Sequence, residues 1–409
     1  MSDADLPRPE PPPEPPREPR GSRRPGPAGP RGPLGASQGS AGRDATPRLL
    51  IAAGGTGGHI YPGLAVAREL LSRHPAASVR FVGTPRGLES ELVGGAGFAV
   101  EMLRAKPLRG GSLLRKLRAV AALPAALYDA GRLLRRSRPD AVVGVGGYLS
   151  GPIVLVASWR GIPTLILEPN FEPGLTNRWL AGRVDAVAVA WEATGRRFGD
   201  KAFLAGNPVR PEIAAVADID SVDAGGDGRL RILLFGGSQG SRSLNEAMMA
   251  ALPLLPAGGR LQITHQTGAA DLERVRAAYA ERGLEARVEP YLHEMHREYG
   301  TCHLVISRAG ATTCAELAAA GRGAVLVPLE LAGGHQRHNA EALAAAGAAI
   351  VVPEAELDGD RLAGILTRLL EDPGRCREMG RRARQLARPD AAARIVDILD
   401  DLIRGAASG

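Results

Sequence analysis

Four segments of this sequence place glycines beside polar side chains directly after a short apolar run. They are Gly54-Gly-Thr-Gly-Gly-His59, Gly146-Gly-Tyr-Leu-Ser-Gly151, Gly236-Gly-Ser-Gln-Gly-Ser241 and Ser307 to Glu316. One such loop often only makes room for a strand-to-helix turn. Four together indicate more, because glycine turns and helix starts expose backbone N–H groups that bind anions. The spacing therefore predicts a phosphate-bearing ligand.

The fourth segment has the most specific arrangement. Gly310 lets the backbone approach a ligand, and 311–313 begin a predicted helix whose amides can hold a diphosphate. Glu316 lies one turn into that helix, where its carboxylate can accept both hydroxyls of a ribose. The alternative is a capping box, because Thr313 and Glu316 have the Ser/Thr-x-x-Glu spacing.

Two further polar residues follow the next strand of the second half. Gln336 and Asn339 come shortly after an apolar run that ends at Pro328, so they are expected to point into the same cleft. Alone, they could equally be an ordinary loop and helix cap.

The glycine loops do not fit the common dinucleotide or triphosphate motifs. The first loop is not G-x-G-x-x-G, and the end of the next strand, 81–84, lacks the acidic residue that binds a nicotinamide ribose. No glycine loop has the G-x-x-x-x-G-K-[ST] spacing. NAD enzymes, kinases and ATPases are therefore disfavoured, and no cofactor is expected.

Apolar runs and helical stretches alternate through both halves of the chain, which predicts parallel sheets with right-handed crossovers. The expected strands are 48–53, 79–83, 141–145, 164–168 and 186–190, then 229–235, 261–266, 287–289, 304–307, 324–328 and 348–352. Helical patterns follow the first and third glycine loops at 63–71 and 244–252. Each half thus begins as a strand, a glycine turn and a helix, the opening of a doubly wound α/β domain.

The predicted organisation is two Rossmann-like domains that face a cleft. Residues 1–47 are rich in proline and poor in apolar residues, so we expect a disordered tail without a secretory signal. The other predicted parts are an N-terminal domain at 48–212, a linker at 213–228, a C-terminal domain at 229–389 and a last helix at 390–409, which could pack on either domain.

Composition and charge narrow the class of partner. The net charge of +7 is compatible with nucleic acid, an anionic membrane or an acidic ligand as partner. Nucleic acid is disfavoured, because aromatic residues, which stack on bases, make up only 4% of the chain. The three cysteines have neither zinc nor disulfide spacing. One uncharged stretch, 141–159, is long enough to imitate a membrane span, but its glycines and Pro152 predict a strand followed by a helix.

With these motifs in place, the chain closely resembles the MurG family, whose members transfer N-acetylglucosamine (GlcNAc) from its UDP carrier to lipid I and so form lipid II in peptidoglycan synthesis. The resemblance runs from about Arg48 to the C-terminus. It rests on the segments 54–65, 146–152, 173–177, 206–210, 236–240, 265–268 and 308–316. It implies the two-domain GT-B fold and an inverting transfer without a metal ion.

The resemblance also implies a set of binding residues. The donor positions fall on Asn170, Arg210, Ser238, Leu292 (through its backbone to uracil), Ala311, Thr312, Thr313, Cys314, Ala315, Glu316 and Gln336. Thr56, Gly57, Gly58 and His59 are expected to meet the diphosphate or the acceptor, with Tyr148 nearby. The chain departs from the family at Leu167 and Pro169, where a histidine and a glutamine are usual.

Transfer at the sugar's C1 needs a base for the acceptor hydroxyl and stabilisation of the departing diphosphate. Helix ends and Arg210 can do the second. His59 is the favoured base, because an unperturbed pKa of about 6.5 suits proton transfer near neutrality. Glu168 is the competing base, and a helix-start histidine could instead only bind phosphate. The pair Asp218 and Asp220 has metal-ligand spacing, but it lies in the predicted linker, so no metal site is expected.

A basic amphipathic segment, 106–127, would suit an anionic membrane surface, and it could also be a surface helix that packs on the core. Because family members dock through the N-terminal domain, the resemblance implies a peripheral enzyme on the cytoplasmic side of the inner membrane. The alternatives are a lipid glucosyltransferase, a UDP-GlcNAc 2-epimerase and a non-catalytic UDP-sugar sensor.

Overall fold

The computed structural model describes residues 46–54, 57–83, 89–103, 123–216, 222, 228–256, 259–330 and 334–408. The predictions for the tail at 1–45, for Thr56, and for most of the linker and of the basic segment therefore concern residues outside the described ones. The side chain of Tyr148 lies outside them too.

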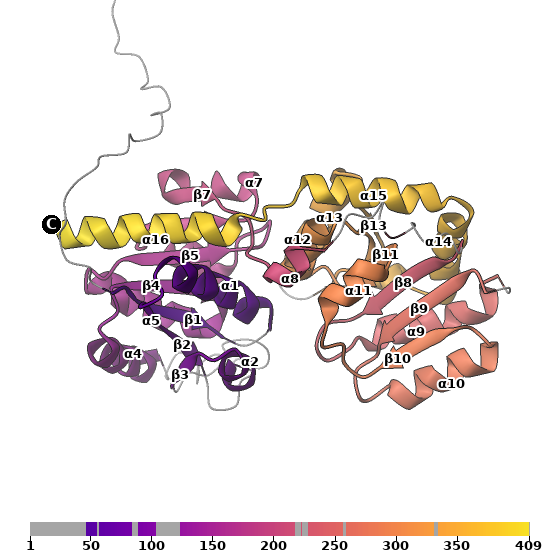
Figure 1. Ribbon diagram of the computed structural model, residues 1–409, viewed down its shortest axis with the longest axis horizontal. Coiled ribbons are helices and arrows are strands. Elements are labelled where there is room, and N and C mark those ends of the chain that lie inside the picture. Colours follow the sequence, from indigo (N-terminus) through magenta and orange to yellow (C-terminus); the bar gives the residue numbers. More distant parts are fainter. Residues whose placement is uncertain are drawn as a thin grey trace, which may run out of the picture. The chain divides into compact units, whose positions relative to one another are not determined.

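Two parallel sheets organise the described chain (Figure 1). The first has the order β3-β2-β1-β4-β5-β6-β7, and the second has the order β10-β9-β8-β11-β12-β13. The strands of the first sheet are β1 (Arg48–Ala53), β2 (Ser78–Gly83), β3 (Ala99–Met102), β4 (Ala141–Gly146), β5 (Thr164–Glu168), β6 (Ala186–Val189) and β7 (Ala202–Leu204). Those of the second are β8 (Leu230–Phe235), β9 (Leu261–Gln266), β10 (Ala286–Glu289), β11 (Leu304–Ser307), β12 (Gly323–Leu326) and β13 (Ala349–Val351).

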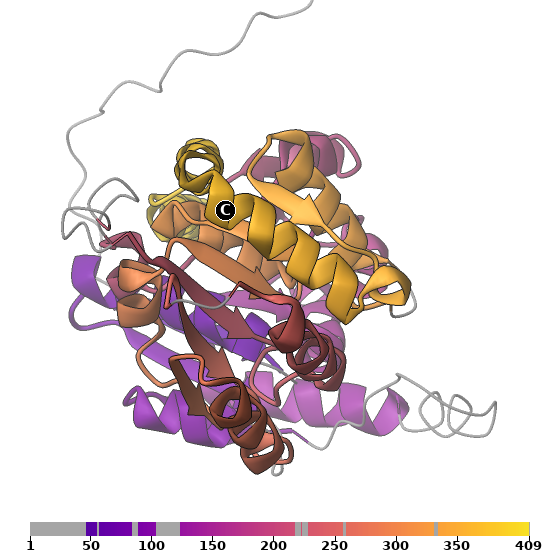
Figure 2. The same ribbon diagram turned by 90° about the vertical axis from the view of Figure 1, so that its right-hand side faces the viewer.

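Helices connect these strands and cover both faces of each sheet; Figure 2 shows them on either side of the second sheet. In the first half they are α1 (Gly57–Arg73), α2 (Glu89–Gly95), α4 (Leu123–Ser137), α5 (Gly147–Trp159), α6 (Leu175–Leu180), α7 (Glu192–Gly195) and α8 (Pro211–Ala214). In the second half they are α9 (Arg242–Ala251), α10 (Leu272–Arg282), α11 (Met295–Thr301), α12 (Ala311–Ala320), α13 (His335–Ala345), α14 (Gly359–Glu371), α15 (Pro373–Gln385) and α16 (Ala391–Ser408). Short 3-10 turns are η1 (Gly199–Lys201), η3 (Leu252–Leu254) and η4 (Glu354–Glu356).

Neighbouring residues of each central strand enter different cores, as buried parallel strands require. In β8, Ile232 and Leu234 pack with α9 and α14, whereas Leu233 and Phe235 pack with α11, α12 and α13. The first sheet divides in the same way, with α1 and α16 on one face and α4, α5 and α6 on the other. The predicted α/β class with two doubly wound sheets is confirmed.

Every strand that the sequence predicted is present, within two residues at each end. Two further strands, β3 and β7, were not predicted. Both are short edge strands whose side chains are exposed or half-buried, so they lack the apolar run of a central strand. Helix α1 also begins earlier than expected, at Gly57 rather than Gly63. The sequence did not indicate this start, because three of the first six residues of the helix are glycine or proline, which disfavour helix. The uncharged stretch 141–159 is the strand β4 and the helix α5.

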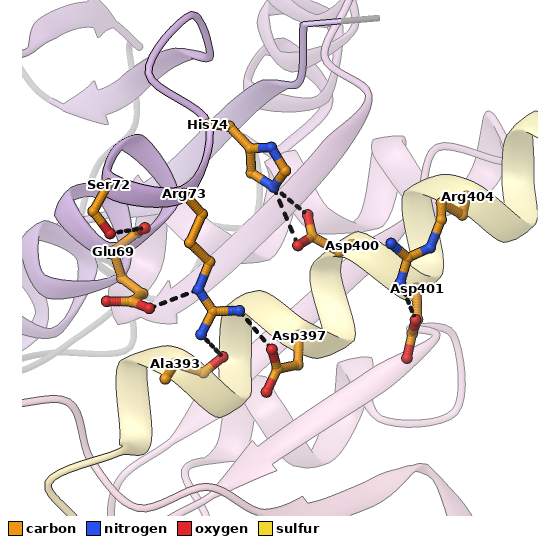
Figure 3. Close-up of polar contacts among 9 residues, drawn as sticks. All are labelled: Glu69, Ser72, Arg73, His74, Ala393, Asp397, Asp400, Asp401 and Arg404. Atoms are coloured by element: carbon orange, nitrogen blue, oxygen red, sulfur yellow. Dashed lines mark hydrogen bonds and ion pairs between the residues drawn. The ribbon is translucent and has the colours of Figure 1, made fainter. Parts of the chain in front are cut away.

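The last helix leaves the second sheet and packs on the first. In Figure 1, α16 lies beside α1, and its buried residues Ile395, Val396 and Leu399 join the core that contains Ile51 and Leu64. Polar contacts flank this apolar seam, as Figure 3 shows.

Two basic side chains at the end of α1 make these flanking contacts. Arg73 donates to the Asp397 carboxylate and to the Ala393 carbonyl, and His74 Nε2 lies 3.1 Å from an Asp400 oxygen. The C-terminal helix is therefore part of the first core.

Candidate functional site

The first glycine loop and the start of α5 pack against each other at the carboxyl edge of the first sheet. Gly146 and Gly147 have φ angles of 112° and 76°, and a Cβ on Gly147 would lie 2.3 Å from the carbonyl oxygen of Gly54. His59 sits in this junction, because a Cβ on Gly146 would come within 2.9 Å of its ring. The glycines are therefore needed for close backbone approach, and Gly146 leaves room for the imidazole.

The imidazole of His59 has a defined hydrogen-bonding direction. Its Nδ1 lies 3.2 Å from the carbonyl oxygen of Gly54, which can only accept. Nδ1 is therefore the protonated nitrogen of the neutral ring, and the lone pair is on Nε2. This tautomer is the one that a proton acceptor at Nε2 requires.

The described chain has two lobes. We define the first lobe as residues 46–210 together with α16, and the second as residues 228–386. The starts of α1 and α12 meet where these lobes contact each other. Thr312 Oγ1 donates to the carbonyl oxygen of Gly58 over 2.8 Å. That carbonyl is available because Pro62, four residues later, has no N–H to donate to it. A proline inside α1 thus supplies an acceptor for a contact between the lobes.

Arg210 and Glu316 form the most buried ion pair near these helix starts. Arg210 donates to Glu316 Oε1 over 2.9 Å, the Tyr299 hydroxyl donates to Oε2 over 3.2 Å, and the guanidinium lies 4.5 Å from the ring centre of Tyr61. Burial raises the pKa of Glu316 above its ordinary value, and Arg210 opposes this rise. The pKa of Tyr61 rises to about 12, mainly through burial.

The capping box considered for Glu316 is absent from the structure. The N-cap of α12 is Gly310, and both carboxylate oxygens of Glu316 bind Arg210 and Tyr299. The carboxylate therefore lies where α12 faces the first lobe, beside the helix start.

Glu168, the second candidate base, is 1% exposed, and its oxygens accept four hydrogen bonds. The donors are the backbone N–H and side-chain amide of Asn170, the backbone N–H of Gly174 and the side-chain amide of Asn177, over 2.8 to 3.0 Å. This arrangement fixes the loop between β5 and α6. A carboxylate that is fully engaged in this way is poorly placed to accept a substrate proton.

The loop after β5 also contacts the second lobe. Asn339 on α13 accepts from the backbone N–H of Phe171 over 2.9 Å and donates to the carbonyl oxygen of Ala309 over 3.2 Å, and His335 Nδ1 lies 2.9 Å from the carbonyl oxygen of Glu172. Asn339 is fully buried, so it ties the lobes together and does not face open space. Gln336, in contrast, accepts from the backbone N–H of Leu329 and borders a cavity.

This cavity, which we call the upper cavity, has a volume of about 570 Å³ and lies at the carboxyl edge of the second sheet. Of the predicted residues, Thr313 and Gln336 line it, together with the glycine loop at 236–240 that carries Ser238. Ser238 itself is exposed on that loop. Arg242, Arg308, Gly310 and Glu354 complete much of the wall.

The sequence did not predict the polar network in the wall of the upper cavity. Arg308 donates to Ser243 Oγ over 2.7 Å and to Glu354, and Ser243 also donates to Glu354 over 2.8 Å. The hydrogen bond from Arg308 is the main reason that the pKa of Glu354 lies below its ordinary value. Arg308 begins the segment 308–316, but Glu354 lies 46 residues later, outside every motif, so only the fold reveals the pair.

The segment 265–268 supports the third glycine loop. Gln266 donates to the carbonyl oxygen of Gly237 over 2.7 Å, and a Cβ on Gly240 would lie 2.0 Å from the carbonyl oxygen of Thr267. His265 is fully buried between Asn245 and Tyr279, and burial lowers its pKa to about 3, so it stays neutral. The histidine of this motif is structural.

The remaining predicted residues lie on the far side of α12 from the upper cavity. Leu292 is buried with Met295, Tyr299 and Cys314, and Ala311 and Ala315 line a smaller cavity between the lobes. Among the described residues, no group of three or more His, Cys, Asp or Glu side chains could hold a metal ion. Asp218 and Asp220 lie outside the described residues.

Family models and relatives match this arrangement over most of the chain. The "Glycosyltransferase family 28 N-terminal domain" matches residues 49–189, and the "Glycosyltransferase family 28 C-terminal domain" matches residues 231–395. The "UDP-N-acetylglucosamine--N-acetylmuramyl-(pentapeptide) pyrophosphoryl-undecaprenol N-acetylglucosamine transferase" of Pelobacter propionicus is 45% identical over 371 residues, which cover 86% of this chain and 98% of that relative. The crystal structure of Acinetobacter baumannii MurG is 34% identical, with a TM-score of 0.72 over 87% of this chain and 99% of that one.

The chain belongs to the MurG family. The resemblance that the motifs indicated is thereby confirmed, and with it the GT-B fold. A UDP-GlcNAc 2-epimerase from Neisseria meningitidis, bound to UDP-GlcNAc, shares that fold with a TM-score of 0.61. The match covers 87% of this chain and 100% of the epimerase chain. Because the two sequences are only 14% identical, the likeness concerns the fold alone.

Proposed function

We propose that this protein transfers GlcNAc from UDP-GlcNAc to the MurNAc sugar of lipid I, which forms lipid II for peptidoglycan. One observation carries the proposal, namely 45% identity over nearly the whole length of a relative named for this transfer. The facing helix starts and the upper cavity supply a place for a diphosphate sugar. The enzyme is thus a hexosyltransferase of peptidoglycan synthesis.

The donor lies across the start of α12 in this proposal. The N–H groups of Ala311, Thr312 and Thr313, which as the first turn have no acceptor within α12, and the positive end of the helix stabilise the diphosphate as it departs. Glu316 accepts the ribose hydroxyls, and the backbone of Leu292 meets the uracil. Cys314 and Ala315 contribute only small side chains to this surface. Burial raises the pKa of the Cys314 thiol to about 12, so the thiol stays protonated.

The ion pair between Arg210 and Glu316 must rearrange in this mechanism. In the free protein Arg210 occupies one oxygen of the carboxylate that the ribose needs. Donor binding therefore moves Arg210 from Glu316 towards the diphosphate, where its charge assists the leaving group. Ser238, Asn170 and Gln336 would then contact the sugar end of the donor.

His59 is the proposed general base, and Gly57 and Gly58 meet the diphosphate or the acceptor in this proposal. For Thr56 and Tyr148 a similar place is expected from the resemblance alone. The Nε2 lone pair of His59, set by the Nδ1 contact to Gly54, can accept the acceptor's hydroxyl proton. Glu168 positions the loop after β5 in this proposal.

Replacement of His59 by alanine tests this assignment. We expect turnover to fall at least tenfold with little change in UDP-GlcNAc affinity, because general bases contribute about 10²- to 10⁴-fold. Steady-state kinetics and donor titration measure the two quantities. An unaltered turnover number would exclude His59 as the base.

The decisive experiment combines the purified protein with UDP-GlcNAc and a lipid I analogue and identifies the products by mass. The proposal predicts a product heavier by one GlcNAc together with UDP. Free UDP-ManNAc formed from the donor alone would instead indicate an epimerase. Binding of UDP-GlcNAc without release of UDP would indicate a sensor, and a preference for UDP-glucose with another lipid would indicate a lipid glucosyltransferase.

We also propose that the first lobe contacts an anionic membrane surface, where the lipid-linked acceptor resides. Leu123 and Tyr128 on α4 and Trp159 at the end of α5 are large exposed apolar residues, at 42%, 66% and 63% exposure. Helix α4 packs on α5, and the exposed side of α4 also carries Arg132 and Arg135. Exposed aromatic and basic side chains together suit a peripheral contact. None of the described helices has both the length and the apolar character needed to cross a bilayer.

Vesicle co-sedimentation tests the membrane contact. Replacement of Trp159 by alanine should weaken binding to anionic vesicles several-fold, and added salt should weaken binding of the unaltered protein. Leu254→Ala is the control, because this side chain is 51% exposed but lies in the second lobe. Equal binding to neutral and anionic vesicles would contradict the proposal.

A further inference from the structure

Arg210 ends the first lobe, but its backbone is anchored to the second. Its carbonyl oxygen accepts from the N–H groups of Ile213 and Ala214, over 3.0 and 3.1 Å, where α8 begins. Ile213 is 1% exposed and belongs to the same core as Tyr299 and Leu317 of the second lobe. A movement of the guanidinium therefore comes from rotation about the side-chain bonds of Arg210.

The guanidinium of Arg210 has two partners of different kinds, one from each lobe. At its edge, Nη2 donates to Glu316 Oε1 on α12 over 2.9 Å. Over its face lies the ring of Tyr61 on α1, whose centre is 4.5 Å from the guanidinium carbon. The same charge is thus bound by a hydrogen bond on one side and by an aromatic face on the other.

One donor of Arg210 is left without an acceptor in this arrangement. The Nε atom is buried, and it has no hydrogen-bond partner among the described residues. A buried donor without an acceptor is unfavourable. A diphosphate offers several acceptor oxygens, so it would satisfy the guanidinium better than Glu316 does once the side chain has turned.

The ring of Tyr61 is a fixed, neutral surface beside the first glycine loop. A Cβ on Gly57 would lie 3.3 Å from the edge of the ring, and the ring also packs on the core of the first lobe. Burial, followed by the neighbouring Tyr291, raises the pKa of Tyr61 to about 12, so the phenol is uncharged. The support for Arg210 therefore comes from the same helix start that carries His59.

The two contacts of Arg210 respond differently to a movement of its guanidinium. The hydrogen bond to Glu316 depends steeply on distance and angle, so it is lost as soon as Nη2 turns away. The attraction between a cation and a ring face persists within about 6 Å of the ring centre. Tyr61 can therefore hold the charge while Glu316 is exchanged for phosphate oxygens.

We propose that Tyr61 is a positioning residue for the transfer, and that its ring carries the Arg210 guanidinium from Glu316 to the departing diphosphate. This role rests on the GlcNAc transfer proposed above, in which Arg210 makes that movement. It gives α1 of the first lobe a part in stabilising a leaving group that the second lobe binds. Tyr61 acts through Arg210 and does not touch the reacting atoms.

Replacement of Tyr61 by leucine and by phenylalanine separates the ring from its hydroxyl. Tyr61→Leu should lower kcat about five- to thirtyfold, the range of a desolvated cation–π contact, and should change the KM for UDP-GlcNAc less than about threefold. Tyr61→Phe keeps the ring and should retain most of the turnover. Phe98→Leu is the matched control, because Phe98 is also a half-buried ring on the first core but contacts Phe81, and its kcat should be unchanged.

A double-mutant cycle with Arg210→Gln tests whether Tyr61 acts through the guanidinium. When Arg210→Gln is already present, Tyr61→Leu should lower kcat by less than about twofold further. An equal loss with and without Arg210→Gln would mean that the ring only supports the fold, and it would overturn the proposal. A loss in Tyr61→Phe as large as in Tyr61→Leu would overturn it too, because the hydroxyl would then be responsible.

Calorimetric titration of the same proteins with UDP makes the test independent of the acceptor. UDP carries the charge that develops on the leaving group, so Tyr61→Leu should weaken its binding at least threefold, and only while Arg210 is present. This coupling without any GlcNAc transfer would support Tyr61 as the partner of Arg210 and count against the proposed function. Transfer without the coupling would overturn the role of Tyr61 alone. Circular dichroism checks folding, and Tyr61→Met replaces Tyr61→Leu if the latter is not folded.

Discussion

Three glutamates near the site share one chemistry but have three different environments. Glu168 accepts four hydrogen bonds from its own loop, Glu316 is buried against Arg210, and Glu354 is half-buried against Arg308 and Ser243. The number and charge of their donors set what each can do: the first holds a loop, the second can exchange its partner, and the third fixes an arginine. Residue type alone could not distinguish them.

Replacement of Glu354 by glutamine should destabilise the protein by roughly 1 kcal/mol at pH 7, because the variant loses a charged partner of Arg308. The folded-state pKa of Glu354 lies below its ordinary value of 4.5. The stabilisation is therefore complete above about pH 4.5 and disappears as the pH falls through the lower folded pKa. Urea unfolding at pH 7 and pH 3 measures this; an equal difference between variant and unaltered protein at both pH values would contradict it.

Replacement of Glu316 by glutamine tests the resting ion pair. The variant should bind UDP at least tenfold more weakly, because a charged acceptor for the ribose is lost. Its stability should change less than that of Glu316→Ala, since glutamine can still accept from Arg210. Calorimetric titration with UDP and urea unfolding give both values. Unchanged UDP affinity would remove Glu316 from the donor site.

At the scale of elements, the third glycine loop depends on its neighbour at 265–268. Gly240→Ala would place a Cβ 2.0 Å from the Thr267 oxygen at a φ of 75°. We expect the loop to shift and donor KM to rise at least tenfold. Gly259→Ala is the matched control, because Gly259 has a similar φ of 71° but nothing within 4 Å of its Cβ position. Similar kinetic effects in both variants would show that backbone strain alone is responsible.

The elements also show what the sequence could and could not predict. Strands with long apolar runs, and the glycine loops that follow them, were predictable because each signal is local. The sequence did not predict the edge strands β3 and β7 or the pairing of Arg308 with Glu354. Each of these features depends on contacts with residues that are distant in the sequence, so no local pattern indicates it. Asn339 was expected at the cleft, yet it binds the backbone of Phe171 and buries itself between the lobes.

At the scale of the whole molecule, α16 joins the first core through apolar packing more than through its ion pairs. Leu399 is fully buried, so Leu399→Ala should cost about 2–5 kcal/mol. Asp397 is exposed, and removal of its contact to Arg73 should cost less than about 1 kcal/mol. Urea unfolding of the two variants compares these values. A larger loss from Asp397→Ala would mean that the polar contacts in Figure 3 dominate.

The return of α16 also has a consequence during synthesis. The last strand of the first sheet ends at Leu204, but α16, which covers one face of that sheet together with α1, begins only at Ala391. At about 5–20 residues per second, the ribosome needs on the order of ten to forty seconds to deliver it. Throughout that interval the apolar surface that Ile395, Val396 and Leu399 cover in the finished protein lacks this cover, so we expect the nascent first lobe to be prone to aggregation until α16 has been made.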